Sequence, residues 1–362
     1  MKETRIEPKR LEELHAKSVV VDGHNHILME LAKRRNRGDR AVFSTYYAPL
    51  IRKGGVNVLM TNIGGDNTCL TNDSDLMLWG SLWMLDMLWE EVEESKDTLA
   101  LCLNSKDIDA ALAAGKIAVL LTMEGGRPLE GKPNYETLVG LRTFYRQGTR
   151  GVQLVDNGRN RIGDGKGEIR TRGGLTNFGI SVVKEMNRLG MMIDVAHLTE
   201  PGFWDVIETS KDPIIDTHSN TRAVCDHPRN LTDEQIKAIA EKGGVIGLSC
   251  HLAMIRKETD KPTVDDLMKH VDHIVKLVGI DHVGFGPDHT DFELPINIWT
   301  PAPGWLEGVF YGVRDTYFIE GLNNITGFPL FTEALVQRGY SDEDIKKVLG
   351  ENWLCVYRQV MG

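Results

Sequence analysis

Eight short apolar runs, separated by longer segments of helical pattern, constrain the fold of this 362-residue chain most strongly. The runs lie at residues 18–22, 56–62, 117–123, 151–154, 191–194, 214–216, 245–249 and 282–286. Strands that alternate with helices favour a parallel sheet of βαβ units, and eight strands are the number that closes a (β/α)8 barrel. A doubly wound open sheet is the competing architecture. It usually has a glycine fingerprint after its first strand, and the segment 22–26 (DGHNH) is not one.

Helix signals in the sequence support this alternation. Residues 75–95 have the apolar period of a helix, and residues 178–189 end at Gly190, a typical helix stop. Thr232 and Ser341 resemble the first residue of a capping box and predict the start of two further helices. We find no internal repeat or low-complexity linker, so we expect one TIM-barrel domain over residues 1–362.

Composition and charge exclude several classes of protein. The chain is 41% hydrophobic and 26% charged, which is ordinary for a globular protein, and its net charge of −10 argues against a nucleic-acid binder. The N-terminus is charged and has no apolar signal core, and no stretch approaches the roughly 20 apolar residues of a membrane helix. The five cysteines are scattered and lack CxxC spacing, which favours a reduced compartment. We therefore expect a soluble, cytoplasmic protein.

Two long loops stand out. Residues 157–174 are rich in glycine and arginine, and we expect them to be mobile. Residues 291–324 are rich in proline and aromatic residues, which is unusual for disorder, so we expect an insertion that forms a lid or a subunit contact. The aromatic residues in question are Trp299, Trp305, Phe310, Tyr311, Tyr317 and Phe318.

Histidines follow three of the apolar runs. His24 and His26 form an HxH pair after the first run, His197 follows the fifth run, and His218 follows the sixth. In an extended strand, residues i and i+2 point to the same side, so both rings of the pair can reach one ion. The carboxyl ends of barrel strands converge on one face, and imidazole is the commonest metal ligand in proteins. The four histidines therefore predict a metal centre.

Two carboxylates complete this constellation. Glu124 follows the third run and precedes Gly125-Gly126, where its two oxygens can bridge two divalent ions, and Asp288 follows the last run as a candidate acid/base. Each residue alone has an ordinary structural explanation, such as a turn carboxylate or a helix cap. Six ionisable groups at the same end of five strands are harder to explain, because burying them without an ion is costly. Divalent ions acidify a bound water and polarise a carbonyl, so the pattern predicts a metal-dependent hydrolase of an amide-like bond.

At this point the sequence resembles the membrane (renal) dipeptidase family of zinc peptidases, peptidase family M19. The resemblance covers residues 18–357 and is densest between residues 174 and 247. The matching motifs are 183–190 (VKEMNRLG), His197, 217–220 (THSN), 225–233 (CDHPRNLTD), 338–345 (RGYSDEDI) and 350–352 (GEN). The resemblance implies a (β/α)8 barrel with two zinc ions, hydrolysis of dipeptides, often with a C-terminal D-residue, and a homodimer or higher homo-oligomer.

The resemblance also implies roles for single residues. His24 and His26 would bind the first ion, Glu124 would bridge both ions, and His197 with His218 would bind the second. Arg229 would bind the carboxylate at the end of the substrate, because a guanidinium fork fits a carboxylate. Asp288 would be the catalytic acid/base.

Two positions depart from the family pattern. The family usually has aspartate at position 26 and histidine at position 156, whereas this chain has His26 and Asp156. Relative to the family pattern, His26 removes one negative charge from the ligands of the first ion, and Asp156 adds one negative charge nearby. We expect Asp156 to contact the substrate, with a hydrogen bond to the following turn as its structural alternative.

Three hypotheses therefore remain open. The chain is a dipeptidase with altered specificity, a hydrolase of a non-peptide amide or related C–N bond in a small metabolite, or a binding relative that holds one ion or none. The weaker first ligand pair makes a single ion the alternative to two. Metal analysis and a substrate panel would separate the three hypotheses.

Overall fold

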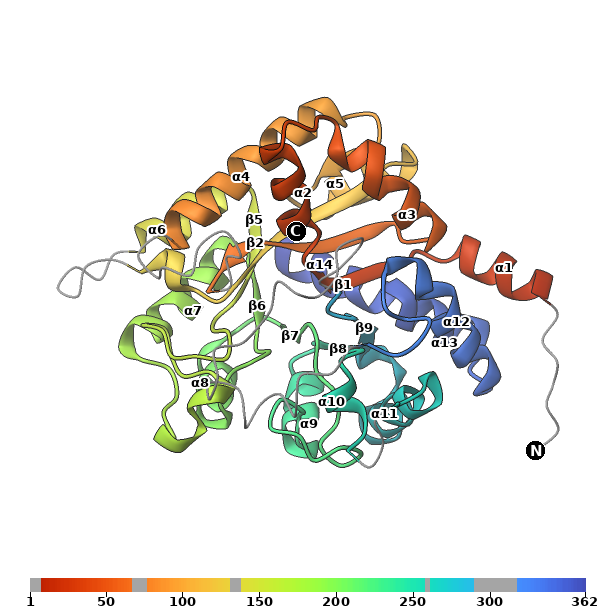
Figure 1. Ribbon diagram of the computed structural model, residues 1–362. Helices are drawn as coiled ribbons and strands as arrows, with labels where there is room; N and C mark the ends of the chain where they lie inside the picture. The colour runs from red at the N-terminus through yellow and green to blue at the C-terminus, as the bar shows by residue number, and fades with distance from the viewer. Residues whose placement is uncertain (1–7, 67–76, 131–137, 258–260, 290–317) are drawn as a thin grey trace.

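The strands form a nearly closed parallel barrel. A computed structural model describes residues 8–66, 77–130, 138–257, 261–289 and 318–362. Neighbouring strands follow the order β1-β2-β4-β5-β6-β7-β8-β9, all parallel, and helices surround them (Figure 1). These strands are β1 Val21–Asn25, β2 Val58–Gly65, β4 Ile117–Glu124, β5 Thr149–Gln153, β6 Met192–Asp194, β7 Ile214–Asp216, β8 Val245–Leu248 and β9 Val283–Phe285. The predicted (β/α)8 barrel is confirmed.

The barrel closes between its first and last strands, next to residues that the sequence marked as functional. The His26 amide donates to the His289 carbonyl at 3.0 Å, and the Asp288 amide donates to the His24 carbonyl at 3.2 Å. These two hydrogen bonds bring the ends of β1 and β9 together at the carboxyl side of the barrel.

Helices connect the strands and form the outer layer. Those before the middle of the chain are α1 Pro8–Lys17, α2 Ile27–Asn36, α3 Ala48–Lys53, α4 Met77–Glu94, α5 Ser105–Ala113, α6 Val139–Arg146 and α7 Asn177–Leu189. The rest are α8 Glu200–Thr209, α9 Asp233–Glu241, α10 Leu252–Ile255, α11 Val264–Val278, α12 Phe328–Gln337, α13 Asp342–Lys346 and α14 Asn352–Met361. The predicted capping box is present at Thr232, where Gln235 closes it, and Gly190 ends α7 in the left-handed conformation.

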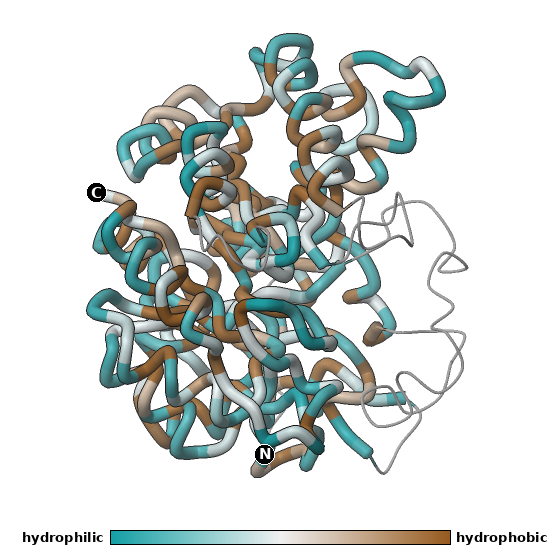
Figure 2. The backbone as a smooth tube through the Cα atoms, turned by 90° about the vertical axis from the view of Figure 1, so that its left-hand side faces the viewer, coloured by the Kyte–Doolittle hydropathy of each residue, from teal (hydrophilic) through white to brown (hydrophobic). Residues whose placement is uncertain are grey.

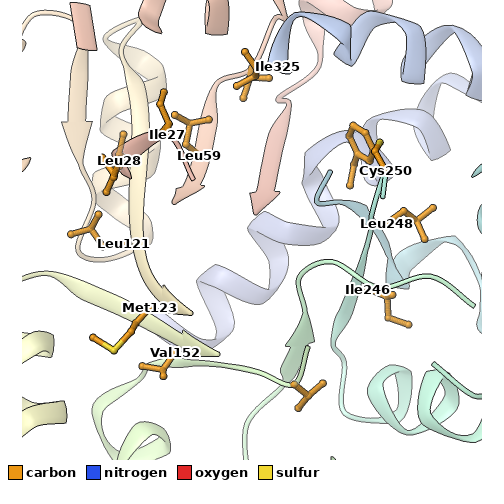
Figure 3. Close-up of a cluster of buried hydrophobic side chains, with 14 of the residues drawn as sticks. Ile27, Leu28, Leu59, Leu121, Met123, Val152, Ile246, Leu248, Cys250 and Ile325 are labelled. Carbon is orange, nitrogen blue, oxygen red and sulfur yellow. The ribbon is translucent and has the colours of Figure 1, made fainter. Parts of the chain in front are cut away.

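Two hydrophobic layers stabilise the barrel. The larger layer lies between the outer faces of the strands and the helices. Figure 3 shows it with Leu59, Leu121, Met123, Val152, Ile246 and Leu248 from the strands and Ile27 and Leu28 from α2. Along the chain, hydrophobic and hydrophilic stretches alternate within the helices (Figure 2), as helices packed on one side require.

The second layer fills the amino-terminal end of the barrel interior. Val58, Ala118 and Leu120 cluster there with Trp353 and Tyr357 of α14. Trp353 has no exposed surface, and a Cβ atom added at Gly23 or Gly284 would lie within 2.6 Å of its ring. The interior is therefore sealed at this end, and its polar residues lie toward the carboxyl ends of the strands.

Several sequence expectations need correction or stay untested. Strand β3 (Leu99–Leu101) was missed; it is only three residues long and pairs with the first half of β4 beside the barrel path. The loop expected to be mobile, residues 157–174, contains a short helix, Lys166–Thr171, and buried residues. Of the expected aromatic insertion, residues 291–317 lie outside the described residues. Among the described helices, none combines the length and apolar character needed to cross a bilayer.

Candidate metal centre

The predicted site residues all lie at the carboxyl ends of the strands. His24 lies in β1, His26 directly follows it, and Glu124 is the last residue of β4. The other five follow strands in loops: Asp156 after β5, His197 after β6, His218 and Arg229 after β7, and Asp288 after β9. Their order along the barrel follows the order of the strands, so the fold itself brings them to one rim.

Glu124 lies at the centre of the group. Its Oε1 atom is 3.7 Å from His24 Nε2, 3.5 Å from His197 Nε2 and 3.9 Å from His218 Nε2. Its Oε2 atom is 3.3 Å from His26 Nε2. A single side chain therefore faces all four histidines, as the bridging role predicted from the sequence requires.

Gly65 makes this position of Glu124 feasible. Its φ angle is +115°, and a Cβ atom at this residue would lie 2.0 Å from the Glu124 carbonyl oxygen. Any other residue would push β2 away from the end of β4, so glycine here lets the two strands meet beside the carboxylate.

Three sets of side chains in the described chain have the geometry to bind a cation. In each set, one candidate ligand atom from every residue lies within 4.8 Å of the others. The sets are His24, Glu124 and His218; His24, His26 and Asp288; and Glu124, Asp156 and His197. His24 occurs in the first two sets and Glu124 in the first and third, so the sets overlap as expected for two adjacent cations.

One hydroxyl group orients two of the histidines. Thr217 Oγ1 donates to Asp194 Oδ2 at 2.5 Å and lies 3.3 Å from His24 Nδ1 and 2.9 Å from His218 Nδ1. A hydroxyl has one proton and two lone pairs. Because its proton goes to Asp194, both Nδ1 atoms must donate to Thr217. Each Nε2 atom then carries a lone pair directed at Glu124.

Asn157 does the same for His197. Its Nδ2 group donates to Asp156 at 2.9 Å, so its Oδ1 atom is the one that faces His197 Nδ1 at 3.0 Å and accepts a proton from it. His197 Nε2 therefore also carries a lone pair, and this atom lies 2.8 Å from His218 Nε2. Two lone pairs at this distance repel each other unless a cation or a proton lies between them.

The donor set therefore fits a divalent metal. Imidazole nitrogens and carboxylate oxygens are typical ligands of catalytic zinc-type ions. Glu124 Oε2 is buried and has no hydrogen-bond partner among the described residues, which a cation would supply.

Burial and neighbouring charges shift the pKa values of the site. Burial lowers the pKa of His24 to about 3, and it lowers that of His197 and His218 well below the usual value, which keeps these rings neutral. Burial would also lower the pKa of His26, but Glu124 and Asp288 outweigh it and raise this pKa. The same contact, with Asp288 Oδ1 3.3 Å from His26 Nε2, outweighs the burial of Asp288 and lowers its pKa.

Two other carboxyl groups of the site have raised pKa values, in contrast to Asp288. Burial, strengthened by repulsion from Asp288, raises the pKa of Glu124 to about 7 despite the opposing effect of His26. Burial and the charge of Glu124 raise the pKa of Asp156 to about 7. Their ionised forms therefore lack sufficient positive charge nearby, which a metal would provide.

Arg229 lies beside the histidines and is 4% exposed. It donates to the His218 carbonyl at 3.3 Å and to Ser219 Oγ at 3.5 Å, both long hydrogen bonds. In the described part of the chain no carboxylate lies within 4.0 Å of its guanidinium group. Its charge is therefore available to an anionic ligand.

The backbone is strained at two site residues. His197 has a φ angle of 68° and Asp288 one of 66°, both in the left-handed region that non-glycine residues seldom adopt. Strain of this kind clusters at functional sites, where the surrounding structure holds it in place.

Several residues that support the site were not predicted from the sequence. Thr217, Asp194 and Asn157 fix histidine tautomers as described, Asn62 Nδ2 lies 3.2 Å from His24 Nε2, and Gln153 Nε2 donates to Glu124 Oε1 at 3.3 Å. Asn62, Gln153 and Asp194 lie in the predicted strands at positions that face into the barrel. A signal did exist, because each is a polar residue near the end of an apolar run.

Comparison with known proteins places this geometry in context. The family model for membrane dipeptidase (peptidase family M19) matches residues 8–297 and 308–361. An uncharacterised protein from the pqqA 5′ region of Klebsiella pneumoniae is 31% identical over 292 residues, covering 76% of this chain and 97% of that protein. Dipeptidase verJ of Clonostachys rogersoniana is 32% identical over 286 residues, covering 78% of this chain and 66% of that protein.

Three solved structures are similar to this chain over nearly its whole length. A metallopeptidase from Rhodobacter sphaeroides, solved with a phosphinate mimic of the dipeptide L-Ala-D-Ala, has a TM-score of 0.78 and 25% identity, covering 95% of this chain and 100% of that chain. The dipeptidase AC, assigned to family M19, has a TM-score of 0.79 and 26% identity, covering 95% and 99%. An amidohydrolase from Pseudomonas aeruginosa has a TM-score of 0.76 and 27% identity, covering 97% and 99%.

Proposed function

The chain belongs to the membrane dipeptidase family, peptidase family M19, and from this premise we propose that it hydrolyses the amide bond of dipeptides at a centre of two divalent cations. The observation that carries the proposal is the position of Glu124, which faces His24, His26, His197 and His218 within 3.9 Å. The family relationship supports metal-dependent dipeptide hydrolysis in general. The geometry supports this rim as the place where it occurs.

The proposed ligands follow from the orientation of the side chains. His24 and His26 hold the first cation, His197 and His218 hold the second, and Glu124 faces both. When bound, divalent cations supply Lewis acidity toward a carbonyl oxygen and acidify a water molecule. The chain's own contribution is to present imidazole lone pairs that are already oriented by Thr217 and Asn157.

Asp288 is the proposed acid/base. Its Oδ1 atom lies 3.3 Å from His26 Nε2, beside the proposed first cation, where its carboxylate can accept a proton from the attacking water. Its side chain is 22% exposed, unlike Glu124 at 4%, so it can reach a substrate. The proton that it accepts can then pass to the nitrogen of the leaving amine.

Arg229 is the proposed anchor of the substrate. A dipeptide carries a free carboxylate one residue beyond the scissile bond. A buried guanidinium group without a described carboxylate partner can bind such a group through two parallel hydrogen bonds. This anchor favours a short substrate with a C-terminal carboxylate over an internal peptide bond. The substrate contact predicted for Asp156 stays a prediction.

A substrate panel with metal control tests the proposal. The purified chain, loaded with Zn²⁺, Co²⁺ or Mn²⁺, is assayed against L,L- and L,D-dipeptides, their C-terminal amides and simple acylated amines. We expect hydrolysis of free dipeptides, weak hydrolysis of the amides and loss of activity in Glu124→Ala. Glu208→Ala, at an exposed position of α8, serves as the matched control. Turnover of acylated amines without turnover of any dipeptide would contradict the proposal and favour a non-peptide amide hydrolase.

Other sequence expectations stay predictions. Zinc as the metal, a homodimer or higher homo-oligomer, a cytoplasmic location and a single domain over residues 1–362 are all part of the proposal. Metal analysis of the purified chain and light scattering would test the first two directly.

A further inference from the structure

We propose that Asp156 is a ligand of the second cation, which is then held by Glu124, Asp156, His197 and His218. This inference rests on the proposed function, because it assigns a residue to the same metal centre. It gives Asp156 a role in the metal site instead of the substrate contact expected from the sequence.

Glu124, Asp156 and His197 lie close together at the rim of the barrel. Glu124 Oε1 lies 3.5 Å from His197 Nε2, the ring nitrogen that carries the lone pair, and Asp156 Oδ1 lies 3.2 Å from the other ring nitrogen, Nδ1. One candidate ligand atom from each of the three residues lies within 4.8 Å of the others. Zinc-type ions bind oxygen and nitrogen at about 2.0–2.2 Å in a tetrahedral arrangement, so two ligands of one ion lie about 3.5 Å apart. The three atoms are thus close enough to contract onto one ion when it binds.

Asp156 is not needed as the proton acceptor of His197, because the proton on His197 Nδ1 already goes to Asn157 Oδ1. Asn157 Nδ2 donates to Asp156 Oδ1 at 2.9 Å and thereby holds the carboxylate at the rim. In the described parts of the chain, no lysine or arginine lies within 4.0 Å of it. Asp156 is a largely buried carboxylate, 18% exposed, that is held in place without a permanent counter-ion.

Negative charge is spread over both cation positions when Asp156 is a ligand. Asp288 belongs to the set with His24 and His26, Asp156 belongs to the set with His197, and Glu124 lies between the two sets. With Asp156 as a ligand, the second cation gains a carboxylate of its own, and a carboxylate lies beside each of the two positions in addition to Glu124 between them. Without it, the second cation has only a share of Glu124, and the carboxylate of Asp156 lies beside that of Glu124 with no cation between them.

Metal stoichiometry in combined variants tests this assignment. The chain is stripped with a chelator and titrated with Co²⁺ alone, with binding followed by visible absorption and bound metal counted after gel filtration. We expect two ions in the wild type, one in Asp156→Asn and one in the double variant with His197→Ala, because both substitutions empty the same position. The double variant of Asp156→Asn with His26→Ala should bind none. The second affinity should fall by at least roughly 10- to 100-fold in Asp156→Asn, the loss known for weaker perturbations of a metal shell.

Two controls keep the result interpretable. Asp66→Asn removes another buried carboxylate whose pKa burial raises to about 7, but Asp66 lies in none of the three ligand sets, so both affinities should stay unchanged. Metal-free Asp156→Asn should be no less stable than the metal-free wild type, because its charge is costly without a cation. Asp156→Ala provides the same test if the amide disturbs Asn157.

Each outcome decides the assignment. Two ions bound with wild-type affinity by Asp156→Asn would overturn it, and a raised KM for dipeptides in the same variant would return Asp156 to the substrate. One ion in the wild type with no change in Asp156→Asn would also overturn it. A wild type that binds two ions, loses one in Asp156→Asn and hydrolyses no dipeptide would support the ligand role and refute the proposed function.

Discussion

Thr217→Val is the sharpest test of how the chain prepares its ligands. The substitution keeps the shape of the side chain but removes a hydroxyl that contacts Asp194, His24 and His218 at 2.5, 3.3 and 2.9 Å. Thr217 is 1% exposed, so water cannot replace it. Each buried polar group left without a partner costs about 1–3 kcal/mol, and three such groups predict a loss of at least about 3 kcal/mol in the free energy of unfolding.

The substitution should also weaken metal binding at both positions. His24 and His218 can adopt the other tautomer once nothing accepts their Nδ1 protons, and perturbing such partners typically costs 10- to 100-fold in metal affinity. Urea denaturation of the metal-free chain measures the first effect, and Co²⁺ titration measures the second. Thr217→Ser keeps the hydroxyl and should keep both affinities, with a stability loss of about 1 kcal/mol for the methyl group. Unchanged Co²⁺ affinities in Thr217→Val would refute the tautomer argument.

Three further predictions concern stability. Burial, together with the charges of Arg222 and Arg229, lowers the pKa of Lys166 to about 7. This pKa lies below that of lysine in the unfolded chain, so the charged form of Lys166 destabilises the folded state. The destabilisation is largest at or below pH 7 and falls as the pH rises toward about 10. Lys166→Met should therefore raise the urea midpoint more at pH 6 than at pH 9, and an equal gain at both would contradict the shift. Arg35 lies 2.6 Å from the fully buried Glu91, so Arg35→Met should cost about 3–5 kcal/mol in urea denaturation, whereas Arg10→Met, which breaks an exposed pair with Asp342, should cost under about 1 kcal/mol. Adding a divalent cation at 100 times its Kd should raise the free energy of unfolding by about 2.7 kcal/mol per site; no change on adding metal would argue against a site formed only in the folded chain.

The sequence predicted most of the barrel because its strands are fully buried and therefore apolar. Strand boundaries moved where polar residues belong to a strand, as in β1, which continues through Asn25. Strand β3 was missed because three residues carry too little periodicity to be recognised. The loop of residues 157–174 looked mobile from its glycines and arginines, yet Arg159 pairs with Asp164 at 2.5 Å and Asn160 binds the Leu154 carbonyl. Side-chain partners that tie down a loop are not visible in its composition.

The site, like the fold, could be predicted from the sequence only in part. Histidines and carboxylates at strand ends could be predicted because parallel strands bring their carboxyl ends to one rim. The residues that set tautomers could not, because Thr217 contacts His24 only after a barrel closes over 193 residues of separation.

The layering of the barrel interior explains why this rim suits a metal centre. Trp353 and the apolar residues around it seal the amino-terminal end, so the polar side chains above them have no water on that side. Asp194 and Thr217 lie between these apolar residues and the rim. The Thr217 hydroxyl donates its proton to Asp194, so its lone pairs are left to accept from the histidines. The rings are then held with Nε2 outward, and the cost of desolvating them is offset when a cation binds. The seal and the hydroxyl therefore serve the same ligands, because one closes the barrel below the rings and the other fixes their tautomers.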